Sequence, residues 1–182
     1  MNTQNSNSER LTLLVSTLRE RQELLATVES CTGGLVGSIL TSVSGASDVY
    51  VGGAITYSNS MKTKCVRVSS NTLEKFGAVS LQTAMEMANG ALDAFEADIA
   101  ISITGIAGPN GGTKDKPVGT VWIGIAHKSL KPDTRRFVFP GDRDSVRQLS
   151  AQAAIQIATQ CLTQHIAPIS HEQERFTGNP YL

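Results

Sequence analysis

The sequence predicts an α/β fold built on a mixed sheet in a single domain. Segments with the apolar spacing of strands alternate with segments that have the spacing of helices. The last three predicted strands follow one another with no helix between them, so at least one pair of them is antiparallel. The chain has 182 residues, which fits one domain with its own core, and no linker or internal repeat divides it.

The first elements are a helix, a strand and a second helix. A polar segment over residues 1–8 is predicted to be disordered, and apolar residues at helical spacing predict a helix over 9–22. Residues 24–28 are predicted to form a short buried strand. This strand leads into Ser30, and a helix is predicted over residues 35–43.

The second predicted strand covers residues 49–56 and is followed by three helices. The first of these contains Lys62, and Ser58 is its expected N-cap. A short helix that ends at Phe76 comes next. An amphipathic helix that begins at Ser80 then runs to residue 95.

The second half of the chain supplies the other three strands, predicted over residues 98–104, 118–126 and 135–139. Residues 105–119 contain five glycines and two prolines and are predicted to form a long loop. Loops of this length in a small domain are usually functional or disordered.

One last helix is predicted after Asp142 or Asp144, either of which can be its N-cap. The domain is expected to cover residues 9–167. Residues 168–182 are polar and are expected to form a tail.

Composition and charge argue against several classes of protein. Lys and Arg total 16, as do Asp and Glu, so bulk charge does not favour nucleic acid as a partner. The apolar runs are far shorter than the ~20 residues of a membrane span. The three cysteines have unrelated spacings and form no CxxC, which argues against disulfides and a zinc site. The polar start lacks a secretory signal, and we expect a cytoplasmic protein.

Ser30 is a candidate nucleophile because it lies where a predicted strand passes into a helix. The start of a helix presents unpaired N–H groups and a partial positive charge, which stabilise a developing oxyanion. Gly33 and Gly34 let a substrate approach the backbone closely. Alternatively, Ser30 or Thr32 only caps the helix, since the pattern is not a G-x-S-x-G nucleophile elbow. Cys31 is expected to be a buried packing residue.

A nucleophilic serine needs a base, and Lys62 is the candidate. It lies in the first turn of its helix, where the helix dipole lowers a lysine pKa, although burial must supply most of the shift. The alternative is a solvated surface lysine. A triad with His127, His165 or His171 stays open but has no support from their positions. Tyr57 either orients these groups through its phenol or is a rim aromatic.

The glycine-rich loop and Arg143 are candidates for ligand contact. Successive N–H groups of such a loop can hold an anion, but its spacing matches neither a Walker A nor a dinucleotide-binding motif. Arg143, at the start of the last helix, can bind a phosphate or carboxylate through two hydrogen bonds. The alternatives are a flexible connection for the loop and an ion pair with Asp142 or Asp144 for the arginine. No motif predicts a metal site.

Five short motifs occur in the order in which they occur in the C-terminal domain of CinA proteins. The sequence from about residue 10 to residue 163 resembles the stand-alone form of this domain, the nicotinamide-nucleotide amidohydrolase. The motifs are Glu29-Ser30-Cys31-Thr32-Gly33-Gly34, Tyr57-Ser58-Asn59, Gly77-Ala78-Val79-Ser80, Thr104-Gly105-Ile106-Ala107-Gly108-Pro109 and Lys116-Pro117-Val118-Gly119-Thr120-Val121.

The resemblance implies a three-layer α/β/α sandwich and a specific reaction. The reaction is hydrolysis of the carboxamide of nicotinamide mononucleotide to nicotinic acid mononucleotide and ammonia, in pyridine nucleotide recycling and without a metal or organic cofactor. Ser30 falls on the family's nucleophile, Lys62 on its general base and Tyr57 on its tyrosine. The residues implied for substrate binding are Cys31, Thr32, Gly33, Gly34, Thr104, Gly105 and Arg143.

The sequence departs from the family pattern at Ser60, where the motif often has Glu, so the role of that carboxylate is open. Three other functions remain open. The chain can be a module that binds a pyridine nucleotide or a protein without turnover, or a different small-amide or phosphoester hydrolase. A role in DNA uptake or damage response rests only on the family's name. The apolar strand around residues 52–53 also predicts a homo-oligomer.

Overall fold

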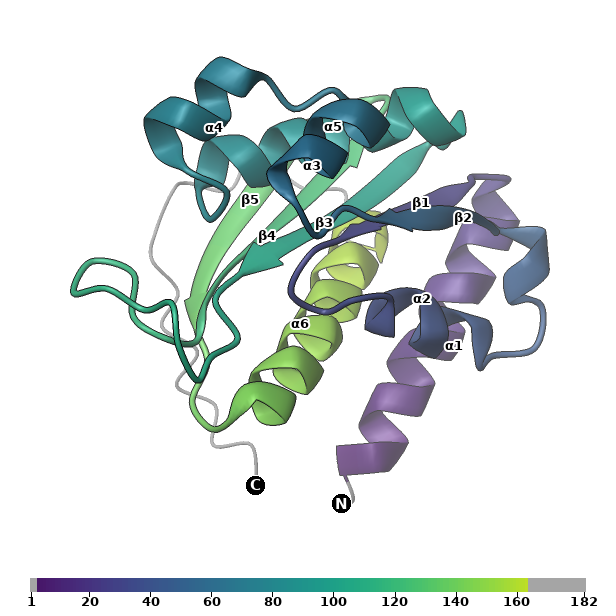
Figure 1. Cartoon of the computed structure of the whole chain (residues 1–182). Helices are drawn as coiled ribbons and strands as arrows, with labels where there is room; N and C mark the ends of the chain where they lie inside the picture. Colours follow the sequence, from purple (N-terminus) through teal and green to yellow (C-terminus); the bar gives the residue numbers. More distant parts are fainter. Residues whose placement is uncertain (1–2, 164–182) are drawn as a thin grey trace.

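Five strands form one mixed sheet in the computed structural model, which describes residues 3–163 (Figure 1). In chain order they are β1 (Leu25–Glu29), β2 (Tyr50–Ile55), β3 (Ile99–Gly105), β4 (Thr120–His127) and β5 (Leu130–Val138). Their order across the sheet is β2-β1-β3-β4-β5. β1 pairs in parallel with β2 and β3, whereas β4 is antiparallel to both β3 and β5. The predicted mixed sheet of five strands is confirmed.

Helices cover both faces of this sheet and complete the three-layer α/β/α sandwich. One face carries α1 (Thr3–Arg21), α2 (Leu35–Thr41) and α6 (Arg143–Thr163). The other carries α3 (Asn59–Val66), α4 (Ser70–Phe76) and α5 (Leu81–Phe95). A short 3₁₀ helix, η1 (Ala46–Asp48), precedes β2. Across residues 3–163, none of the helices has the length and apolar character that crossing a membrane requires.

Two elements begin earlier than the sequence predicts. α1 begins at Thr3 rather than near residue 9, within the segment that was expected to be disordered. Residues 3–8 are polar, so the apolar spacing that predicts the rest of the helix is absent there. β5 begins at Leu130 rather than at residue 135. The sequence did not predict this early start because the first residues of β5 are exposed at the sheet edge and show no apolar alternation. The predicted tail over 168–182 lies outside the described residues.

Close helix packing holds α3 in place above the sheet. α3 contributes the buried Val66 to a small core that also contains Val28 of β1 and Met87 of α5. Gly90 of α5 lies directly against the carbonyl oxygen of Val66, and a Cβ at that position would overlap it. The missing side chain therefore lets α3 approach α5 closely.

The connections after β1 and β2 leave the sheet on opposite faces. β1 leads into α2 on one face, and β2 leads into α3 on the other. Ligands of open α/β sheets bind beyond the carboxyl ends of the strands. Glu29, the last residue of β1, pairs with Ile55 of β2 and Ile103 of β3. Ser30 and Thr56 therefore leave the sheet at the same edge.

Candidate active site

Ser30 and Lys62 meet at this edge, beyond the carboxyl ends of β1 and β2. The Lys62 Nζ atom lies 3.0 Å from the Ser30 Oγ atom. Ser30 is 8% exposed and Lys62 is 1% exposed. The Ser30 N–H donates to the carbonyl of Ile103 over 2.9 Å, which fixes the start of the turn against β3. The structure thus brings together the two residues that the sequence analysis proposed as nucleophile and base.

The start of α3 determines where Lys62 points. Ser58 is the N-cap, as predicted, and its Oγ accepts from the Met61 N–H over 3.2 Å. Lys62 Nζ then reaches the carbonyl oxygens of Thr56, at 2.7 Å, and Tyr57, at 3.4 Å. No carboxylate among the described residues forms an ion pair with it. The lysine is therefore surrounded by neutral oxygens, and the alternative of a solvated surface lysine is wrong.

Burial lowers the pKa of Lys62 below its ordinary value of 10.5. A Cys31 thiolate would oppose this shift, but burial raises the pKa of the Cys31 thiol to about 12. At neutral pH the thiol is therefore protonated and does not offset the effect of burial on the lysine. Cys31 is buried, as expected, and its high pKa makes it a poor nucleophile.

The sequence analysis missed Glu29, which stabilises the start of α2. Glu29 is 2% exposed. Its Oε2 accepts from the N–H groups of Gly34, at 2.9 Å, and Val36, at 3.2 Å, and its Oε1 accepts from that of Gly37 at 2.9 Å. A charged residue at the end of a buried strand was the available signal. The N-cap position belongs to Gly34, so the alternative that Ser30 or Thr32 caps the helix is wrong.

The turn between Ser30 and α2 is shaped by two glycines. Gly33 has φ +64° and Gly34 has φ +95°, values that residues with a Cβ rarely adopt. Thr32 is fully buried, and its hydroxyl has no hydrogen-bond partner within residues 3–163. Arg147, which the sequence analysis did not single out, donates from Nη2 to the Thr32 carbonyl over 3.0 Å. Its position four residues after Arg143, on the same face of α6, was the available signal.

Arg143 connects the glycine-rich loop to Tyr57. Its Nη1 donates to the Gly108 carbonyl over 2.9 Å, and its Nη2 donates to the Tyr57 phenol over 3.2 Å. Asp142 instead accepts from the Ser145 N–H, which confirms it as the cap of α6, and Asp144 pairs with Arg147. Because Tyr57 is 63% exposed, this arginine–tyrosine pair lies at the open side of the Ser30–Lys62 pair, which we call the dyad.

Thr104 and Gly105 lie at the same edge of the sheet but have structural contacts. The Thr104 hydroxyl is buried and donates to the Ala78 carbonyl over 2.7 Å. Gly105 pairs with Val121 of β4, and a Cβ there would lie 2.8 Å from the Thr120 carbonyl oxygen. Lys116 of the loop donates to the Phe76 carbonyl over 3.0 Å. These contacts hold the loop against both β4 and α4, whereas a flexible connection would not be held.

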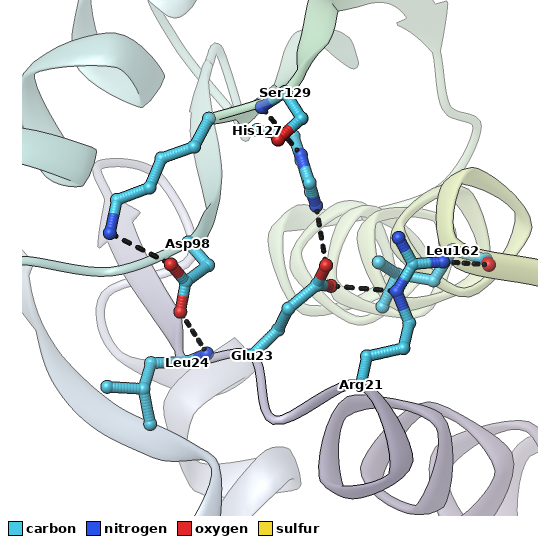
Figure 2. Close-up of polar contacts among 8 residues, drawn as sticks. Arg21, Glu23, Leu24, Asp98, His127, Ser129 and Leu162 are labelled. Carbon is cyan, nitrogen blue, oxygen red and sulfur yellow. Dashed lines mark hydrogen bonds and ion pairs between the residues drawn. The ribbon is translucent and has the colours of Figure 1, made fainter.

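His127 pairs with Ile99, the first residue of β3, so it lies at the opposite end of the strands from Ser30, which bonds to Ile103. Figure 2 shows its contacts. Its Nδ1 accepts from the Ser129 N–H over 3.0 Å, so Nε2 carries the proton and donates to Glu23 over 3.2 Å. Glu23 also pairs with Arg21, whose guanidinium reaches the Leu162 carbonyl at the end of α6. This network joins α1, β4 and α6, so a triad of Ser30 with His127 is excluded.

His165 and His171 lie outside the described residues. Across residues 3–163, no three side chains of His, Cys, Asp or Glu are placed to hold a metal ion.

A family model and curated relatives match most of the chain. The model for the CinA C-terminal domain matches residues 8–162. A CinA-like protein of Thermotoga neapolitana is 46% identical over 144 residues, which are 79% of this chain and 35% of that protein. A CinA-like protein of Leptospira borgpetersenii is 48% identical over 140 residues, 77% of this chain and 34% of that protein. The chain thus spans about a third of the length of these relatives.

Solved structures share the fold. The competence/damage inducible protein CihA from Agrobacterium tumefaciens superimposes with a TM-score of 0.83 at 34% identity, covering 87% of this chain and 96% of that one. A CinA superfamily protein from Escherichia coli superimposes with a TM-score of 0.82 at 34% identity, covering 90% of this chain and 94% of that one. The names of these relatives state a family and no reaction.

Proposed function

The chain belongs to the CinA C-terminal domain family, and from this premise we propose that it hydrolyses the carboxamide of nicotinamide mononucleotide. The products are nicotinic acid mononucleotide and ammonia. The observation that carries the proposal is that the buried Lys62 amine lies 3.0 Å from the Ser30 hydroxyl. A serine with a neutral lysine beside it is a nucleophile with its base, and such a pair attacks amides and esters.

The partners of Lys62 favour its role as a base. A neutral amine has two N–H bonds and one lone pair. The carbonyl oxygens of Thr56 and Tyr57 can only accept hydrogen bonds, so they take the two N–H groups. The lone pair is then left for the remaining partner, the Ser30 hydroxyl, which can donate.

The reaction proceeds in two halves through an acyl-enzyme. Ser30 Oγ attacks the amide carbon while its proton passes to Lys62 Nζ. Lys62 then protonates the amide nitrogen, the C–N bond breaks, and ammonia leaves with the acyl group on Ser30. Water attacks the ester and gives its proton to Lys62, and Ser30 recovers that proton as the acid is released. The positive charge of the pyridinium withdraws electrons from the amide and assists both attacks.

The remaining polar groups around the dyad are assigned to the oxyanion and the phosphate. The N–H groups of Thr32 and Gly33 donate to no acceptor within residues 3–163, so they remain for the oxyanion. The Arg143 guanidinium has five N–H donors and uses two on Gly108 and Tyr57. Its other donors are available for the substrate phosphate, and Tyr57 holds this guanidinium beside the dyad.

We also propose that the protein is a homo-oligomer in a reducing cytoplasm. Val51 and Ile55 of the edge strand β2, and Met61 of α3, are exposed apolar side chains. They support a homo-oligomer in which a second copy covers this edge. The three cysteines of the chain are free thiols, which supports a reducing cytoplasm.

Ammonia release from nicotinamide mononucleotide tests the activity. We expect turnover by the wild type and a loss on the order of 10³-fold or more in both Ser30→Ala and Lys62→Met. Ser38→Ala on α2 and Lys64→Met on α3 are matched controls at exposed positions and should keep full activity. Turnover that survives in either dyad variant contradicts the mechanism.

Two other outcomes identify the alternatives. A wild type that releases no ammonia but is stabilised against heat by the nucleotide is a binding module. Release of phosphate in place of ammonia identifies a phosphoester hydrolase.

A further inference from the structure

Arg147 joins α6 to the turn that carries Ser30. Its Nη2 donates to the Thr32 carbonyl over 3.0 Å, and its Nη1 lies 3.3 Å from the Asp144 carboxylate. Asp144 has an 83% exposed side chain, so this ion pair contributes little to stability. The bond to Thr32 is therefore the contact through which Arg147 affects the site.

That bond fixes the orientation of a whole peptide group. In a trans peptide, the carbonyl of one residue and the N–H of the next point in opposite directions. Arg147 holds the Thr32 carbonyl, so the Gly33 N–H points away from the guanidinium. Gly33 and Gly34 both have positive φ and no Cβ, so their own conformational preferences restrict this peptide only weakly. A contact from outside the turn is needed to select one orientation.

The Gly33 N–H is one of the few donors that the turn has left. The Ser30 N–H is used by Ile103, and those of Gly34, Val36 and Gly37 are used by Glu29. The N–H groups of Cys31, Thr32 and Gly33 have no acceptor in the part of the chain that the structure describes. Of these donors, the Gly33 N–H is the one in the peptide group that Arg147 holds, so an oxyanion that uses it depends on Arg147.

We propose that Arg147 is a positioning residue that orients the Gly33 N–H as an oxyanion donor. It acts through the backbone of the turn and does not touch the substrate. This inference rests on the proposed amide hydrolysis for its effect on rate, while its effect on the turn can be measured separately.

Steady-state kinetics of ammonia release separate this role from a contact with substrate. We expect Arg147→Met to lower kcat at least tenfold, since loss of one oxyanion donor costs about 10²–10³-fold. KM for nicotinamide mononucleotide should change by less than about threefold, because the ground-state carbonyl gains little from that donor. Arg147→Lys keeps a donor near Thr32 and should recover part of kcat. Asp144→Asn removes only the ion pair and should match the wild type.

The amide resonance of Gly33 tests the turn itself, whether or not the protein turns over this substrate. We expect it to shift or broaden in Arg147→Met and to stay unchanged in Asp144→Asn. Arg147→Ala, which also removes the donor to Thr32, gives the same comparison if the methionine variant does not fold. An unchanged Gly33 resonance overturns the proposal, as does a raised KM with unchanged kcat, which would make Arg147 a substrate contact. If the wild type releases no ammonia, the amidohydrolase proposal fails and the resonance still decides the role of Arg147.

Discussion

Burial of Lys62 favours the neutral amine that the proposed mechanism needs. Its amine lies among neutral oxygens, with no carboxylate paired to it in the described chain, so hydrogen bonds alone offset the cost of placing an ammonium there. Its helix position contributes less, because a helix terminus is worth only ~0.3–1 kcal/mol. The pKa of Lys62 is therefore set mainly by burial, which the sequence could not reveal.

We predict that ammonia release follows the titration of Lys62. Burial lowers the pKa of this amine below 10.5, and only the unprotonated form accepts the Ser30 proton. The rate should therefore rise with pH up to that lowered pKa and reach a plateau below pH 10.5. Lys62→Arg stays protonated and should be inactive throughout. A wild-type profile that is flat, or that keeps rising at pH ~10, contradicts the assignment.

We predict that Glu29→Gln destabilises the protein. The amide has one acceptor oxygen where the carboxylate has two, so at least one N–H at the start of α2 loses its partner. The free energy of unfolding should fall by about 2 kcal/mol in urea denaturation at neutral pH. Glu74→Gln, at an exposed position on α4, is the control and should stay within ~0.5 kcal/mol. Equal stability of the two variants would show that Glu29 does not hold the helix start.

At the level of single residues, sequence patterns reached only part of the site. Ser30 and Lys62 could be proposed because a strand-to-helix turn and an N-cap each have a local signature. Glu29 and Arg147 were missed because their sequence signals are weak and both act on backbone groups that only the folded turn presents. Thr104 was proposed as a ligand contact, but its hydroxyl donates to the carbonyl of Ala78, which lies 26 residues away along the chain.

Among the elements, the junction of α3 with α5 controls the dyad because α3 carries Lys62. The two helices pack at Gly90, which faces the Val66 carbonyl oxygen. The N-cap Ser58 predicted α3, the N-cap Ser80 with apolar periodicity predicted α5, and the order of elements predicted the mixed sheet. The helix crossing was not predictable, since a glycine within a helix can have several causes. The early start of α1 was not predicted either, because the polar residues 3–8 show no apolar periodicity.

We predict that Gly90→Ala lowers both stability and turnover. At an exposed helical position this change stabilises by ~0.5–1 kcal/mol. At Gly90 the new Cβ overlaps backbone, which must shift, and the expected loss is about 1–3 kcal/mol in urea denaturation. The shift displaces Lys62, so ammonia release should fall as well. Asn89→Ala, exposed on the same helix, is the control; a more stable Gly90→Ala variant would show that α3 does not depend on this approach.

For the whole molecule, different groups of residues lie at the two ends of the strand β1. The carboxyl edge of β1 holds the dyad, while the amino edge holds the network of Arg21, Glu23 and His127 that joins α1 to α6 (Figure 2). Beside the dyad, β2 is the edge strand and exposes Val51 and Ile55. An exposed apolar edge strand is a site for association.

We predict that this edge joins copies of the chain. Sedimentation should give a dimer or larger assembly for the wild type and a smaller species for Ile55→Lys, because a charge at this position opposes burial. Leu13→Lys changes a similarly exposed residue on α1 and should leave the assembly intact. A wild type that sediments as a monomer at tens of micromolar contradicts the prediction.

The most direct measurement for the central claim is the mass of the peptide that contains Ser30 after acid quenching during turnover of nicotinamide mononucleotide. We predict that Ser30 carries the nicotinic acid mononucleotide acyl group in the wild type, and that Ser30→Ala shows neither the adduct nor ammonia release. Ammonia release that continues in Ser30→Ala would contradict the account.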